Sequence, residues 1–269
     1  GTILLLKKLL SARINAKSLQ LIYVLNPLVI IELSGNIHFE ALMIFFVLLA
    51  VWLINKQRYI SSAGALSLAV QAKLLPLIFI PLLLRQIGLK KTINYAIVCL
   101  IITVALSLIL LNSPERFAHF AESLRLYYGK FEFNGSFYLL LRSIGQMILS
   151  YNPIAVLSKI MIVLALSGMI WVYYRKLELL TGIFWLLAIY LVFSAVVHPW
   201  YLTPLVAFSA FIRFRFALLW SALIPLSYYT YSNNPYNENY WITGIEYLIV
   251  YGFLIWELKK QVSPLAEMK

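Results

Sequence analysis

The chain contains no aspartate, a single cysteine and little charge of any kind. Its ten acidic residues are all glutamates, and charged residues make up only 12% of the 269, whereas a soluble domain carries about 25%. The lone Cys99 excludes an intrachain disulfide and any CxxC site. A Gly-rich phosphate loop, HExxH and GxSxG are also missing from the sequence. These absences exclude nucleotide and metalloprotease chemistry on a cytoplasmic domain.

What the chain has in abundance is apolar sequence, at 62% of its residues. Long apolar runs without strand-like alternation are typical of transmembrane helices, because a backbone in lipid must satisfy its own hydrogen bonds. The sequence therefore predicts an all-α polytopic transmembrane protein, forming one transmembrane domain over 1–269. We expect apolar segments at 18–34, 37–54, 60–84, 92–111, 154–174, 179–197, 200–212, 216–230 and 241–258.

The start of the chain resembles the end of a membrane span. Residues 1–6 are almost entirely apolar, begin with Gly1 rather than Met, and are followed by basic residues. No signal-peptide n-region or cleavage site precedes them. We therefore expect that an N-terminal span and its outer loop are missing from this sequence.

The segment 60–84 decides the topology. As one helix it would be about 37 Å long, at about 1.5 Å per residue, which suits a single tilted span. However, Lys73 and Pro76 interrupt it and Pro81 follows. The alternative is a helical hairpin of two half-spans, 60–72 and 74–84, with Lys73 at its tip.

The distribution of basic residues favours the hairpin. Inner loops of membrane proteins carry an excess of Lys and Arg. The hairpin puts 16 of the 22 basic residues on the inner face, whereas a single span divides them 11 to 11. The outer six are Lys73, Arg116, Arg125, Lys130, Arg142 and Lys159. The same topology makes 112–150 an extracytoplasmic loop followed by a re-entrant segment, because 136–150 is shorter than the ~20 residues that a span usually needs.

This topology also collects the other polar groups on the outer face, although only Lys and Arg were used to derive it. The candidates for substrate binding are Glu32, Asn36, His38, Glu40, Lys73, Arg125, His198 and Tyr201. Ionisable residues at membrane depth are costly and hence functional candidates. Structural explanations also exist: Lys73 can snorkel to the interface, and either histidine can be a hydrogen-bonded turn residue. The tyrosines and tryptophan of the last outer loop suit either an interfacial belt or stacking on a sugar.

Three motifs, spread over about 26–205, resemble the GT-C superfamily of polytopic glycosyltransferases, and most closely its bacterial members related to GPI-type mannosyltransferases. The first is Asn26-Pro27-Leu28 followed by Glu32, Gly35, Asn36, His38 and Glu40. The second is Ala72-Lys73-Leu74-Leu75-Pro76 with Pro81, which resembles the "K..P…P" hairpin of that family. The third is His198-Pro199-Trp200-Tyr201, similar to its late "HPWY" turn.

The resemblance implies transfer of a hexose such as mannose from a polyprenyl-phosphate donor to a glycan or lipid acceptor. The expected location is the outer face of a bacterial cytoplasmic membrane. In that family an acidic residue, normally Asp, is catalytic and lies in the first outer loop. This chain has none, so the catalytic residue stays unassigned and activity depends on that loop being present upstream. No cofactor is implied; a divalent metal finds no support in the sequence, and neither does a nucleic-acid partner.

The alternative function is a polytopic transporter or a lipid or oligosaccharide flippase. Such proteins share the intramembrane charges and broken helices. They would also show an internal repeat and polar residues near the midplane. The sequence shows no repeat, and its polar groups gather at one predicted face.

Overall fold

The computed structural model describes residues 1–13, 15–129, 131–149, 151–232 and 237–262, and over these ranges the chain is helical without a strand. This confirms the predicted all-α class. The first half contains α1 (Thr2–Leu10), α2 (Ala16–Val24), α3 (Pro27–Val29), η1 (Ile30–Gly35), α4 (Glu40–Asn55), α5 (Tyr59–Ala72), η2 (Leu75–Leu82), α6 (Leu83–Ile87), α7 (Leu89–Leu110) and α8 (Pro114–Gly129). The second half contains α9 (Ser136–Ile148), α10 (Ile154–Tyr174), α11 (Leu179–Val192), η3 (Pro199–Leu202), α12 (Thr203–Ser209), α13 (Phe216–Leu223), η4 (Ile224–Ser232) and α14 (Tyr240–Val262).

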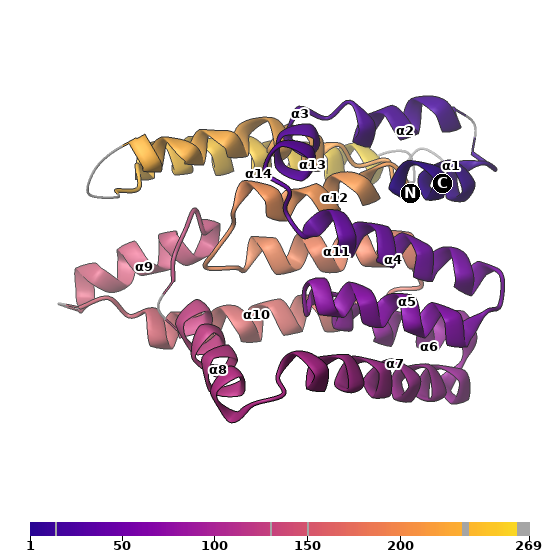
Figure 1. Ribbon diagram of the computed structural model, residues 1–269. Coiled ribbons are helices and arrows are strands. Elements are labelled where there is room, and N and C mark those ends of the chain that lie inside the picture. Colours follow the sequence, from indigo (N-terminus) through magenta and orange to yellow (C-terminus); the bar gives the residue numbers. More distant parts are fainter. Residues whose placement is uncertain (14, 130, 150, 233–236, 263–269) are drawn as a thin grey trace.

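The helices form a bundle in which most axes run roughly along one direction (Figure 1). Helix α4 packs on α1 and α5, α5 packs on α7, and α11 packs on α10, η2 and α12. Three helices in the described part of the chain are long and apolar enough to cross a membrane: Leu89–Leu110, Ile154–Tyr174 and Tyr240–Lys260. The chain is therefore an integral membrane protein.

Segment 60–84 does not form one continuous helix. Helix α5 ends at Ala72, and Lys73 is extended, with φ −163° and ψ 134°. The chain then turns back as η2 and α6, which pack against α7 (Figure 1). The returning limb differs from the expected α-helical half-span, because Leu75–Leu82 is a 3-10 helix. Pro76 and Pro81 lie within it, and each lacks the N–H that an α-helix would use.

The first broken span bends where Asn26 precedes Pro27. The axes of Ala16–Val24 and Pro27–Gly35 differ by 50°, as in a broken span or a re-entrant loop. The Asn26 side chain accepts a hydrogen bond from the Val29 N–H at 3.2 Å and donates to Ser221 Oγ at 2.9 Å. Asn26 is thus a helix N-cap, with proline at the first helical position. The Asn-Pro pair fixes the direction in which η1 continues.

The polar connection expected over 112–135 contains a helix, α8, whose described residues are mostly exposed. After it, residues 131–136 (the 131–136 segment) lie across the end of α11. The Phe133 N–H donates to Ala195 O at 3.1 Å, and the Val197 N–H donates to Phe133 O at 2.8 Å. A Cβ on Gly135 would lie 2.8 Å from Ala195 O, so this close approach needs glycine. The 131–136 segment is therefore fixed beside the string His198 to Tyr201.

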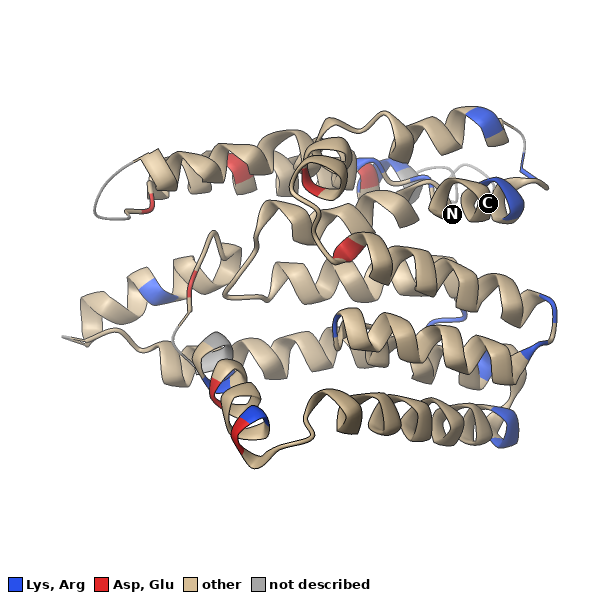
Figure 2. Cartoon of the chain, in the orientation of Figure 1, with Lys and Arg blue, Asp and Glu red and all other residues tan. Residues whose placement is uncertain are grey.

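Basic residues gather at the end of the bundle that holds the α4–α5 and α6–α7 connections (Figure 2). Acidic residues lie mainly elsewhere, on α8, on α14 and near the bend after α3 (Figure 2). This gathering of Lys and Arg at one end agrees with the charge distribution from which the hairpin topology was chosen.

Candidate functional site

Glu32 is the centre of a buried hydrogen-bond network. Its side chain is fully buried on η1. It accepts from Tyr228 Oη at 2.5 Å and from Asn36 Nδ2 at 2.9 Å, and His38 Nε2 lies 3.3 Å from its second oxygen. A buried carboxylate is tolerated when its oxygens are bonded in this way. The network fixes the turn that carries His38.

Lys73, at the tip of the hairpin, is paired with Glu40. Its Nζ lies 2.7 Å from Glu40 Oε1 and 3.3 Å from the centre of the Tyr201 ring. The Lys73 side chain is 23% exposed, whereas that of Glu40 is 6% exposed. Burial lowers the pKa of the Lys73 ammonium, and the Glu40 carboxylate opposes this shift. The Lys73 ammonium is therefore held between a carboxylate and an aromatic face, on a side chain that is partly exposed.

Trp200 joins the two histidines. Its ring stacks on His38 at 4.1 Å with planes 13° apart, and on His198 at 4.2 Å with planes 9° apart. The Nδ1 atom of His198 is buried and has no hydrogen-bond partner among the described residues. The pKa of His198 is lowered to about 4, first by burial and then by the charge of Lys73 and the neighbouring His38. His198 is thus a neutral imidazole at neutral pH.

These residues form one group, here called the histidine–lysine cluster. It consists of Glu32, Asn36, His38, Glu40, Lys73, His198, Trp200, Tyr201 and Tyr228. Segments that are far apart in the sequence supply it: η1 with the start of α4, the hairpin tip, η3 and η4. The structure thus brings seven of the eight sequence-predicted site residues together. Arg125 lies apart from them, as an exposed residue of α8.

A second buried network supports the cluster, and the sequence analysis missed it. Glu246 on α14 is fully buried and accepts from Trp220 Nε1 at 2.9 Å and from Asn134 Nδ2 at 3.3 Å. Glu238 Oε1 accepts the Asn134 N–H at 2.6 Å. The ring of Phe133, one residue earlier, lies 4.4 Å from that of His198. A carboxylate inside the apolar run 241–258 was the signal that could have identified Glu246.

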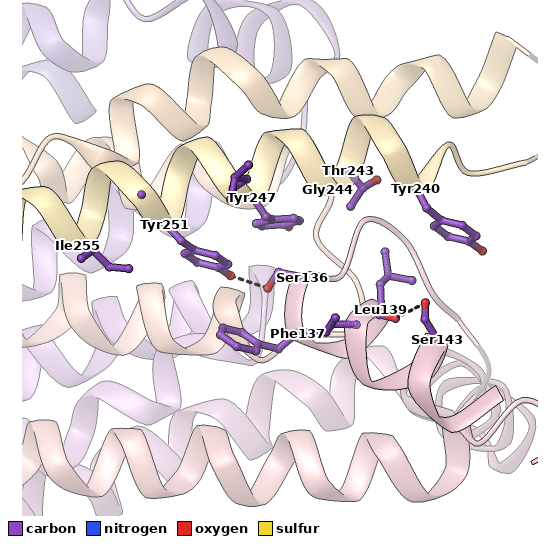
Figure 3. A pocket seen from close by; sticks show the side chains of 13 residues that line it. Ser136, Phe137, Leu139, Ser143, Tyr240, Thr243, Gly244, Tyr247, Tyr251 and Ile255 are labelled. Atoms are coloured by element: carbon purple, nitrogen blue, oxygen red, sulfur yellow. Dashed lines mark hydrogen bonds between the residues drawn. The ribbon is translucent and has the colours of Figure 1, made fainter. Parts of the chain in front are cut away.

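A cavity of about 580 Å³ lies between α9 and α14. Figure 3 shows Tyr240, Tyr247 and Tyr251 of α14 facing Phe137 and Leu139 of α9. Its lining is largely apolar, and at its floor Tyr251 Oη lies 2.6 Å from Ser136 Oγ. Ser136 ends the 131–136 segment, so this α9–α14 groove begins three residues from Phe133 and its contact with His198.

Lys73, two histidines and buried carboxylates gather at one end of a polytopic helical bundle, as the resemblance to GT-C type membrane glycosyltransferases led us to expect. Residues 3–87 match the family model of the MptA/B family, described as alpha-(1->6)-mannopyranosyltransferase, N-terminal domain. Over these residues, less than half of the chain, the sequence is similar to that family. The match supports a membrane mannosyltransferase that uses a mannose donor and a glycan acceptor. No curated protein and no solved structure matches the chain.

The match confirms the predicted superfamily and the predicted glycosyltransferase activity. It covers α1 to α6, which contain Glu32, Asn36, His38, Glu40 and Lys73. The other half of the histidine–lysine cluster comes from sequence beyond the matched region.

Proposed function

We propose that the chain transfers mannose from a polyprenyl-phosphate donor to the glycan acceptor at the outer face of a bacterial cytoplasmic membrane. The observation that carries the proposal is the ammonium of Lys73, held at the hairpin tip among the residues of the histidine–lysine cluster. In the reaction, an acceptor hydroxyl oxygen bonds to the anomeric carbon and the bond from that carbon to the phosphate oxygen breaks. The leaving lipid phosphate takes the electron pair, and a nearby cation stabilises it. The acceptor hydroxyl gives its proton to a general base.

Lys73 suits that role for a physical reason. Glu40 and Tyr201 hold its Nζ from two sides, so little reorganisation is needed when negative charge develops on the phosphate. Neither Arg125, exposed on α8, nor the neutral His198 supplies a comparable fixed charge. His198 instead offers an unpaired Nδ1 that can hydrogen-bond a sugar or acceptor hydroxyl.

We assign neither carboxylate of the cluster as the base that takes the acceptor proton. Glu40 is paired with Lys73, and Glu32 is occupied by Tyr228 and Asn36. Their geometry supports positioning instead: Glu40 orients Lys73, and Glu32 orients His38.

The α9–α14 groove supports the lipid-linked nature of the donor. It is a largely apolar channel along a membrane-length helix, and it begins beside the 131–136 segment. A polyprenyl chain needs an apolar surface next to its phosphate, whereas a nucleotide-sugar needs a soluble domain. Apolar lining with a few polar groups at one end is typical of such ligand sites.

The test is an assay with radiolabelled polyprenyl-phosphate mannose and the full chain. Replacing Lys73 with alanine should lower kcat by about 100-fold, as for the loss of one charge-stabilising donor. Lys73→Arg, which keeps the charge, should retain more activity than Lys73→Ala. Glu40→Gln should give a smaller loss, because the cation remains but its orientation is relaxed.

Lys159→Ala is the matched control, since Lys159 is an exposed lysine outside the cluster. Unchanged turnover in Lys73→Ala, in protein that is inserted and folded, would remove Lys73 from the site. A wild-type protein that used only a nucleotide-linked donor would contradict the proposed donor class.

A further inference from the structure

A second cavity opens beside the start of α14. Its volume is about 410 Å³, within the range of about 300–1,000 Å³ usual for small-molecule sites. It is lined by Tyr229, Asn237, Glu238, Asn239, Tyr240 and Trp241. Polar and apolar atoms contribute to the lining in similar amounts, unlike the α9–α14 groove.

The lining has the chemistry of a carbohydrate site. A pyranose ring presents an apolar C–H face and an edge of hydroxyl groups. Trp241, 84% exposed, and Tyr229, 51% exposed, supply aromatic faces, while Glu238 and the two asparagines supply acceptors and donors for hydroxyls. Large rigid aromatic rings bind with little loss of conformational entropy.

The cavity is connected to the histidine–lysine cluster on two sides. Tyr229 follows Tyr228, whose Oη donates to Glu32 at 2.5 Å. On the other side Glu238 accepts the N–H of Asn134 at 2.6 Å, next to Phe133 on His198. A sugar chain in this cavity would thus lie beside the residues that hold the two histidines in place.

The edges of the cavity are fixed before any ligand binds. Asn239 Oδ1 accepts the Trp241 N–H at 3.1 Å and so caps the start of α14. The Tyr240 ring lies 5.6 Å from the Arg142 guanidinium, and Arg142 is paired with Glu132 at 2.5 Å. Preorganised walls reduce the entropic cost of binding.

We propose that this cavity is the acceptor subsite, in which Trp241 and Tyr229 stack on sugar rings of a mannose oligosaccharide distal to the ring that is extended. The inference rests on the proposed function, because it requires a glycan acceptor at this face. It differs from an interfacial aromatic belt, in which the same rings would contact only lipid headgroups.

The experiment compares two acceptors in the full-length protein: an α-1,6-linked mannotetraose, which has sugar rings distal to the one that is extended, and methyl α-mannoside, which has none. Trp241→Ala should raise the KM for mannotetraose about tenfold and leave the KM for methyl mannoside and kcat unchanged. A tenfold change corresponds to about 1.4 kcal/mol, close to the ~0.5–1.5 kcal/mol of an aromatic contact. Trp241→Phe, which keeps an aromatic face, should restore most of the affinity.

Trp171→Ala is the control, because Trp171 is also an exposed tryptophan, at 53%, and lies on α10, outside the cavity. Equal KM values for mannotetraose in wild type and Trp241→Ala would overturn the subsite, as would an equal rise for both acceptors. If Trp241→Ala does not fold, Tyr229→Ala replaces it. Its KM for mannotetraose should rise by a similar factor, while its KM for methyl α-mannoside should not change. A wild-type protein that transfers mannose to neither acceptor would contradict the proposed function instead.

Discussion

At the scale of single residues, His198 shows how burial selects a chemical role. Its ring stacks on Trp200 and lies 4.4 Å from Phe133, and only 6% of the residue is exposed. Burial, Lys73 and His38 together lower its pKa to about 4. The sequence made this histidine a candidate for substrate binding without deciding which part of the substrate it contacts. A neutral imidazole favours hydrogen bonding to a hydroxyl over pairing with a charged phosphate.

The lowered pKa predicts a pH-dependent contribution to stability. The unfolded chain has a histidine pKa near 6.5 and the folded one near 4, so the unfolded state binds more protons between these values. Stability should therefore fall as the pH drops from about 6.5 to about 4, by on the order of 2–3 kcal/mol. Thermal unfolding in detergent should show a weaker decline in His198→Asn than in wild type.

His119→Asn is the control, since His119 is exposed on α8. Glutamates that titrate in the same range are shared by all three proteins and cancel in the comparison. Parallel pH profiles for wild type and His198→Asn would show that the imidazole is not held neutral.

At the scale of elements, several helix ends depend on side chains distant in sequence. Helix α13 has no cap from its own N-cap residue, Arg215. Instead, Glu257 of α14 accepts the N–H groups of Arg215 at 2.7 Å and Phe216 at 2.9 Å. A carboxylate at a helix N-terminus satisfies free donors and complements the helix dipole. Glu257 therefore ties α13, which carries Trp220 and Ser221, to the last helix.

Glu257→Ala should destabilise the protein by about 1–2 kcal/mol, the usual loss for a helix cap. The measurement is the midpoint of thermal unfolding in detergent. Glu178→Ala is the control: its carboxylate is 79% exposed and makes only a 3.4 Å contact with Arg13, so its loss should cost little. If the two variants unfold at the same temperature, Glu257 is not an effective cap.

At the scale of the whole molecule, charge and hydrophobicity orient the bundle. The α4–α5 and α6–α7 connections lie at one end of the bundle, and both carry basic residues (Figure 2). The histidine–lysine cluster lies where α5 ends and η2 begins, at the other end of α5. The positive-inside rule predicts that the basic end is the inner one, and the cluster would then face outward, as we propose.

This orientation predicts the labelling of introduced cysteines by a membrane-impermeant maleimide applied from outside. Ser232→Cys should react, and Gln57→Cys, in the α4–α5 connection, should not; both native side chains are exposed. The wild type is its own background control, because Cys99 is fully buried. The opposite pattern would invert the topology and move the cluster to the inner face.

The local features of this protein follow from its sequence. Apolar runs such as 92–111 identify a span because a helix in lipid has no other way to satisfy its backbone. Lys73 with the two prolines predicts a break in 60–84, because proline removes hydrogen-bond donors. Polar residues at predicted outer turns identify candidates for the site. Each of these inferences needs only near neighbours along the chain.

Only the tertiary structure decided which of these residues meet. Three contacts join positions 33 to 196 residues apart: the pairing of Lys73 with Glu40, the stacking of Trp200 on His38, and the Tyr228 bond to Glu32. Arg125 was a lesser candidate by residue type, and α8 holds it away from the cluster. The structure also shows that Glu246 belongs to the network beside the cluster, through its hydrogen bonds to Trp220 and Asn134. Such contacts depend on how helices pack in three dimensions, and periodicity and charge along one chain do not specify that packing.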